Sequence, residues 1–129
     1  MKKLTTLILL LLSPLVIAQE KEVWACVQVK GAQINWENGS WERSGVTPES
    51  LLLTIDGVNS SYKQGDYNPW KLNCSLGDGR VSCVSRNIGD HIYLDPASGK
   101  MGISFLGGAL DTGDTRDSVS AQIYNCTKF

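Results

Sequence analysis

The sequence predicts a small all-β domain, an antiparallel barrel or sandwich of about seven or eight strands held by two disulfide bonds. Short stretches of alternating apolar and polar residues recur along the chain, with turn residues between them. Thirteen glycines, together with Asn-Gly, Asp-Gly and Asp-Pro pairs, supply those turns. No helical period in the mature chain is long enough to predict a helix. Four cysteines in so short a chain indicate disulfides and an oxidising compartment.

Five stretches show the alternation of a half-buried strand: residues 23–29, 51–56, 91–95, 101–106 and 118–129. In the first of these, the valines and Ala25 share one face, while Trp24, Cys26 and Gln28 share the other. In the last, Tyr124 and Cys126 lie on the face opposite the smaller apolar residues.

A β-hairpin is predicted at Asp78-Gly79, because Asp-Gly is a strong signal for a two-residue type I′ turn. The register set by this turn places Cys74 opposite Cys83 at a non-hydrogen-bonded pair. The Cα atoms of such a pair lie within the distance that a disulfide spans.

The two remaining cysteines, Cys26 and Cys126, are then expected to bridge the first strand to the last. A structural zinc site is disfavoured, because the chain has no Cys-x-x-Cys and a single histidine. We therefore expect two disulfides, no metal and no cofactor.

A secretory signal peptide is predicted over residues 1–18, with cleavage after Ala18. Lys2 and Lys3 form a short basic start, and residues 4–17 are apolar and uncharged. That apolar run is shorter than the roughly 20 residues of a spanning helix, so we expect no membrane span. The mature protein is expected to be periplasmic or secreted in a bacterium.

Residues 19–129 are expected to form one domain, since removing 18 of the 129 residues leaves 111. Without the two lysines of the leader, 10 basic side chains face 13 acidic ones, a net charge of −3. Such a charge argues against nucleic acid as a partner, because phosphate backbones attract clustered Lys and Arg.

Gly39-Ser40-Trp41 matches the Gly-x-Trp signature of the first strand in lipocalin- and avidin-type barrels, which the chain resembles there. The resemblance implies that Trp41 plugs the closed end of a barrel and that Arg116 packs across it. Further segments span most of the mature chain: Trp24-Ala-Cys26, Trp36, Leu53-Thr-Ile-Asp-Gly57, Ser82-Cys83, Tyr93-Leu-Asp-Pro96, Arg116-Asp117 and Cys126-Thr-Lys-Phe129. Together they resemble a family of small exported proteobacterial proteins, which implies an exported β domain and brings no chemistry with it.

No catalytic constellation is predicted, so we expect a protein that is not an enzyme. Asp111-Thr-Gly resembles the active-site turn of aspartic proteases, but only 16 residues follow Gly113, too few for the rest of such a site. Ser104 lies in a near miss of the nucleophile elbow, without a following helix. His91 is the single imidazole, and it is expected at a strand surface.

Three aspartates, Asp111, Asp114 and Asp117, are spaced three apart and leave calcium binding open. Their spacing fits no EF-hand loop, and a solvated acidic turn is the simpler interpretation.

Aromatic residues are the remaining candidates for binding. Tyr67 and Trp70 lie in a turn-rich stretch, where exposed aromatic side chains anchor partners and ligands. Trp36 and Trp41 are further candidates, with core filling as the alternative.

Two functions are therefore expected. The first is an exported, non-catalytic binding protein for a small apolar molecule or an envelope partner. The alternative is a secreted inhibitor of a hydrolase such as a lysozyme or protease, since a disulfide-rigid loop loses little entropy on docking. A sizeable internal cavity would favour the binding protein, and a filled core with a rigid protruding loop would favour the inhibitor. Buried, converging carboxylates would favour an enzyme.

Overall fold

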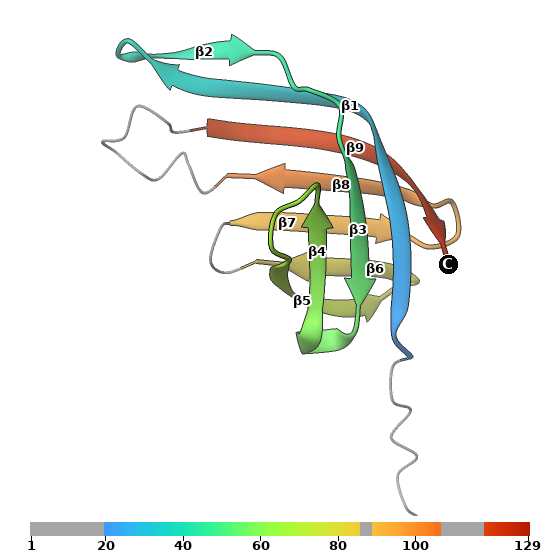
Figure 1. Cartoon of the computed structure of the whole chain (residues 1–129). Coiled ribbons are helices and arrows are strands. Elements are labelled where there is room, and N and C mark those ends of the chain that lie inside the picture. The colour runs from blue at the N-terminus through green and yellow to red at the C-terminus, as the bar shows by residue number, and fades with distance from the viewer. Residues whose placement is uncertain (1–19, 86–88, 107–117) are drawn as a thin grey trace, which may run out of the picture.

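The computed structural model describes residues 20–85, 89–106 and 118–129 of the chain (Figure 1). Within these ranges nine antiparallel strands form one sheet, and no helix is long and apolar enough to cross a membrane. The strands are β1 (Glu22–Glu37), β2 (Ser40–Ser44), β3 (Ser50–Ile55), β4 (Ser60–Gln64), β5 (Trp70–Gly77), β6 (Arg80–Val84), β7 (Asp90–Asp95), β8 (Lys100–Phe105) and β9 (Ser118–Lys128). A 3-10 turn, Gly57–Asn59, joins β3 to β4.

The sheet is a closed barrel rather than a sandwich, because β1 pairs with β9 as well as with β3. Eight strands form the ring, and β2 lies outside it as one extra strand. Each ring strand pairs with the next one in the chain, apart from the insertion of β2, so the barrel is of the up-and-down type. The predicted all-β fold is confirmed, although β2 and β4 lie where no strand was predicted.

Strand β1 is twice as long as predicted and serves two partners along one edge. Its first half, Glu22–Val27, pairs with β3, and its second half, Gln33–Glu37, pairs with β2. The register against β9 shifts between Gln28 and Lys30, which marks a β-bulge. A bulge bends its strand, and Figure 1 shows β1 curving between the part beside β3 and the part beside β2. The β1–β2 hairpin, which we call the arm, therefore lies along one side of the ring, with β1 still paired to β9 as far as Asn35.

The barrel interior is filled by side chains. Inward positions alternate with outward ones, as a strand period of two requires. The fully or nearly buried apolar residues form one cluster: Trp24, Cys26, Leu51, Leu53, Ile55, Tyr62, Leu72, Cys74, Val81, Cys83, Ile92, Leu94, Met101 and Tyr124. In β1 and β9 the inward face is the one that carries the cysteines, and the valines of β1 therefore lie on the outside or at the edge of the core.

Both predicted disulfides are present inside the barrel. Cys74 faces Cys83 across the β5–β6 hairpin, in the register predicted from its turn, and the two are bonded. Cys26 is bonded to Cys126 and joins β1 to β9, the pair that closes the ring. The Met101 sulfur lies 3.9 Å from both sulfurs of this second bridge. The bridges therefore belong to the hydrophobic core.

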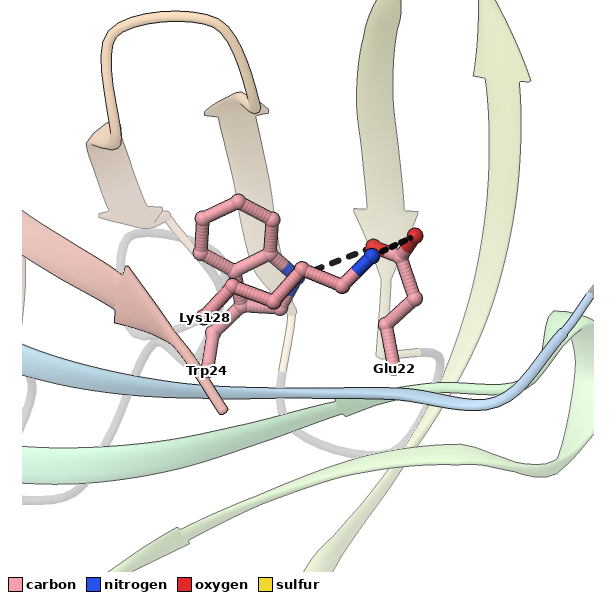
Figure 2. A network of polar contacts seen from close by, with 3 residues as sticks. All are labelled: Glu22, Trp24 and Lys128. Atoms are coloured by element: carbon pink, nitrogen blue, oxygen red, sulfur yellow. Dashed lines mark hydrogen bonds and ion pairs between the residues drawn. The ribbon is translucent and has the colours of Figure 1, made fainter.

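One end of the barrel is closed by Trp24, which is 4% exposed (Figure 2). Its indole nitrogen donates to a Glu22 carboxylate oxygen at 3.1 Å, and the Lys128 ammonium lies 2.6 Å from the other oxygen. Lys128 is the register partner of Trp24, and both side chains reach the Glu22 carboxylate. The Lys128 ammonium also lowers the pKa of the Glu22 carboxyl. A tryptophan of the first strand and a cation of the last thus cover this end.

The role expected for Trp41 is therefore wrong. Trp41 lies on β2 outside the ring and is 40% exposed. The reason is the turn at Asn38-Gly39, where both residues have positive φ, because it folds β2 back along the part of β1 that pairs with β9 and no longer with β3. Arg116, its expected partner, lies outside the described residues.

Candidate functional site

The two ends of the barrel interior carry different side chains. Opposite the end closed by the indole lies the end that we call the mouth, where the buried side chains include Gln28, Ser85 and Asp90. Glu49, just before β3, and the β4–β5 connection, residues 65–69, border it. Within the described ranges, no buried side-chain nitrogen or oxygen lacks a hydrogen-bond partner. The buried polar side chains at the mouth are therefore satisfied by hydrogen bonds within the fold.

A hydrogen bond crosses the interior at the mouth. The Tyr62 hydroxyl of β4 donates to the Asp90 carboxylate of β7, although β5 and β6 separate these strands in the ring. Both side chains are buried, at 6% and 5% exposure. Burial raises the pKa of the Asp90 carboxyl, against the smaller opposing effects of Tyr62 and His91. Burial, followed by the bond to Asp90, raises the pKa of Tyr62.

A second tyrosine completes the polar layer. The Tyr124 hydroxyl of β9 donates to Gln122, and Gln64 of β4 also reaches it. Burial and then the charge of Glu49 raise the pKa of Tyr124 to about 12. Two neutral tyrosines and one buried carboxyl share this layer. The Tyr62–Asp90 bond therefore links opposite walls of the barrel within this layer.

Tyr67 and Trp70, both predicted to bind, lie together at the mouth. The Trp70 ring stacks on Tyr62 with centroids 5.0 Å apart, and Tyr67 lies 5.8 Å from Trp70 on a tilted ring. Tyr62 is buried at the base of this series, whereas Tyr67 is 69% exposed. A pocket of about 280 Å³ lies beside it, lined by Tyr67, Glu49, Ser50, Gln64 and Gly65. Tyr67 is thus exposed at the mouth, whereas Trp70 is partly buried and packs against the core.

Trp36 and Trp41, the other two predicted residues, lie on the arm. They are register partners across the β1–β2 hairpin, with centroids 5.4 Å apart in an edge-to-face arrangement. The arm and the β4–β5 connection are different parts of the molecule, so the four predicted residues form two separate pairs.

A groove of about 540 Å³ lies on the outer face of the barrel, over β7, β8, β9 and β1. One side of it is a row of register partners, Tyr93, Gly102, Ile123 and Lys30. Tyr93 and Ile123 are 58% and 55% exposed, and the missing side chain of Gly102 leaves a gap between them. This surface, the outer groove, was not predicted from the sequence.

The floor of the outer groove is the next row of partners along the strands. Ser104, Ala121 and Ala32 oppose one another there, and all three side chains are small. The row beyond pairs Val119 with Ile34, which restores larger apolar side chains. A floor of small residues between two larger rows makes the depression, since side chains two apart on a strand lie on the same face.

The signal that could have revealed this groove is the presence of apolar residues on both faces of β1 and β9. Val27 and Val29 are 58% and 54% exposed on β1 because Cys26 and Gln28 occupy the interior. On β9 the same alternation places Ile123 outside and Tyr124 inside. Contiguous apolar patches on soluble proteins commonly mark interaction sites.

Two other residues considered for chemistry, His91 and Ser104, lie side by side on the outer face. His91 is exposed on β7, opposite Ser104 in register, and both face outward. Residues 107–117, with the Asp111 turn and the three aspartates considered for calcium, lie outside the described residues. In the part of the chain that the structure describes, no group of three His, Cys, Asp or Glu side chains could hold a metal.

Comparison with known proteins adds no family: no family model, no curated protein and no solved structure matches the chain.

Proposed function

We propose that this protein is an exported, non-catalytic binding module that holds an apolar segment of an envelope partner protein in the outer groove. The observation that carries the proposal is the cross-strand row in which Gly102 opens a gap between exposed Tyr93 and Ile123, above a floor of small side chains. Large exposed aromatic and aliphatic groups beside a depression supply the anchors and pockets of protein interfaces.

A protein partner is favoured over a small apolar molecule by the shape of the surface. Pockets for small molecules enclose most of their ligand. The barrel interior is filled by the core cluster, and the outer groove is a depression on the outer surface. Val27, Val29 and Ile34 are further exposed apolar side chains of β1. Lys30, at the end of the row, favours a partner with an acidic group beside its apolar side chains.

The proposed compartment is the periplasm or the exterior of a bacterial cell. Two buried disulfides are compatible with an oxidising compartment. The predicted signal peptide over residues 1–18 supports export.

Site-specific photo-crosslinking in the exporting cell tests the proposal. A photoreactive residue at Tyr93 should form an adduct of discrete mass with one protein. The same residue at Leu76, which is 62% exposed on β5, should not, and Ala121→Arg should abolish the adduct by filling the floor. Equal labelling from both positions would contradict the proposal, and an adduct of small mass would identify a small apolar ligand instead.

The arm supports a second candidate function, inhibition of a hydrolase. The core is filled, and a hairpin stabilised by two packed tryptophans lies along one side of the ring (Figure 1). At the tip of the hairpin, the Ser40 hydroxyl donates a 2.7 Å hydrogen bond to the Glu42 carboxylate. If a hydrolase such as a lysozyme or protease is the target, inhibition should fall with Trp36→Ala and should survive Ala121→Arg.

A further inference from the structure

The pocket beside Tyr67 at the mouth is separate from the outer groove and has a different chemistry. Its lining residues are one carboxylate, one aromatic ring and two neutral polar side chains, together with a glycine: Glu49, Tyr67, Ser50, Gln64 and Gly65. Among the described lining residues there is no Lys or Arg, and the neighbouring side chain on β4, Lys63, lies on the opposite face of that strand. The described part of the pocket therefore presents one carboxylate and one aromatic ring.

The two groups that matter most are held in place by the backbone. The Glu49 carbonyl accepts from the Gln28 amide at 2.9 Å, and the Glu49 amide donates to the buried Gln28 side chain at 3.2 Å. The Tyr67 amide donates to the Gln64 carbonyl at 3.3 Å, closing a turn in which Gly65 has a φ of 54°. Because that φ suits glycine, the turn that presents Tyr67 is fixed by the sequence.

The aromatic series adds to the negative character of the site. Trp70 supports the Tyr67 ring from one side and stacks on Tyr62 from the other, and Tyr62 is bonded to Asp90. The face of an aromatic ring carries partial negative charge and attracts cations within about 6 Å of its centre. Glu49 is also close enough to Tyr124 for its charge to raise the pKa of that phenol.

We propose that this pocket binds a monovalent organic cation, an alkylammonium or guanidinium group, between the Glu49 carboxylate and the Tyr67 ring. A volume of about 280 Å³ suits one such head group. Ser50 and Gln64 supply hydroxyl and amide oxygens for its N–H groups. The cation has two sources, a free amine or the basic side chain of a bound peptide, and both present the same chemistry to the pocket.

Titration of the mature, disulfide-bonded protein, followed by amide NMR, tests the proposal. n-Butylammonium and N-acetyl-arginine methylamide are the two cationic probes, and butan-1-ol is the neutral match for n-butylammonium. We expect saturable shifts at Tyr67 and Gln64 with a cation and none with the alcohol. Tighter binding of n-butylammonium indicates a free amine as the source, and tighter binding of the capped arginine indicates a protein side chain.

Two variants test the contributions of the Glu49 carboxylate and the Tyr67 ring to cation binding separately. Glu49→Gln should weaken cation binding about tenfold, and Tyr67→Leu about three- to tenfold, as the loss of one ion pair or one cation–π contact predicts. Glu42→Gln, an exposed carboxylate on the arm, should change nothing, and Ala121→Arg should leave cation binding intact even if the outer groove fails its own test. Equal binding of the neutral alcohol, an unaltered affinity in Glu49→Gln, or no saturation by about 100 mM of either cation would overturn the proposal.

Discussion

Asp90 is the residue whose environment departs most from that of an ordinary surface carboxylate. It is buried at the mouth, and it receives the Tyr62 hydroxyl rather than a cation. A carboxylate in such a site is short of solvation, so its neutral form is favoured and its pKa rises. The Asp90 side chain joins opposite walls of the barrel, because Tyr62 donates to it from across the ring. Its ionised form lowers the stability of the fold, since a buried charge is poorly solvated.

The first prediction concerns the pH dependence of Asp90→Asn. The folded-state pKa of Asp90 is raised, so its contribution to stability is complete below the unfolded pKa and is lost as pH rises through the folded pKa. The asparagine oxygen still accepts from Tyr62 and stays neutral. We expect the free energy of unfolding of the variant to exceed that of the wild type at pH 8, with the advantage shrinking towards pH 4, in denaturant titrations.

Asp95→Asn is the matched control, for which we expect the opposite change in the free energy of unfolding at pH 8. The Ser98 hydroxyl and the Ala97 amide lower the pKa of the Asp95 carboxyl, so its contribution is present above the unfolded pKa and is lost as pH falls. This variant should lose stability at pH 8 relative to the wild type. Parallel stability curves for Asp90→Asn and the wild type would contradict the assignment.

At the scale of elements, the arm and the ring use the same turn for different purposes. Asn38-Gly39 and Asp78-Gly79 are both two-residue turns with positive φ at each position. The second joins β5 to β6 within the ring, whereas the first attaches β2, which has the ring on one edge alone. A change at the arm should therefore be felt locally, and a change in the ring globally.

The second prediction compares Gly39→Ala with Gly79→Ala. An added Cβ meets nothing within 4 Å at either site, so the cost is that of the positive φ, about 1 kcal/mol. Gly79→Ala should lower the global free energy of unfolding by about that amount. Gly39→Ala should speed hydrogen exchange of β2 amides about fivefold and leave the denaturation midpoint unchanged. Equal loss of global stability in the two variants would show that the arm folds with the ring.

For the whole molecule, closure of the barrel depends on strands far apart in the chain. β1 meets β9 at the same place where Cys26 is bonded to Cys126, 100 residues later. The other bridge, Cys74–Cys83, spans 9 residues within a hairpin that its turn already specifies. The carbonyl of Gly99 accepts from the Cys126 amide, and the Cβ of any other residue at Gly99 would collide with the Cys126 carbonyl. Strand β9 is thus held on one side by the Gly99 carbonyl and on the other by the disulfide to β1.

The third prediction is that the two bridges differ in their contribution to stability. In the loop-entropy model, the long bridge stabilises the fold by about 4.7 kcal/mol and the short one by about 2.7 kcal/mol. Replacing both Cys26 and Cys126 by Ala should therefore lower the free energy of unfolding in urea more than replacing Cys74 and Cys83. The comparison holds if the dependence on urea is the same in both double variants, and equal losses would contradict it.

Much of this architecture follows from local sequence. The Asp78-Gly79 turn sets its own register, and the first disulfide follows from that register. The second bridge follows by elimination, and with it the contact between the first and last strands. Tyr67 and Trp70 could be proposed as binding residues because turn residues surround them. Local signals sufficed for the β5–β6 hairpin and its disulfide, but not for the β1–β2 hairpin.

The length and bend of β1 could not be predicted, because residues after Val29 lose clear alternation and are held by β2 and β9 rather than by their own pattern. Because this extension of β1 was not predicted, the position predicted for Trp41 was also wrong. The Tyr62–Asp90 bond and the outer groove also escaped prediction, since each joins strands that are distant in the chain.

The sequence by itself determined that this chain is an all-β domain with two specific disulfides, because strand period, turn chemistry and cysteine spacing act over a few residues. Tertiary structure alone decided that the sheet closes into a barrel and which face of each strand points inward. The physical reason is that β1 and β9 carry apolar side chains on both faces, so local hydrophobicity is ambiguous. Pairing across 100 residues resolves it by placing the cysteines inside, and the apolar side chains left outside form the proposed binding surface.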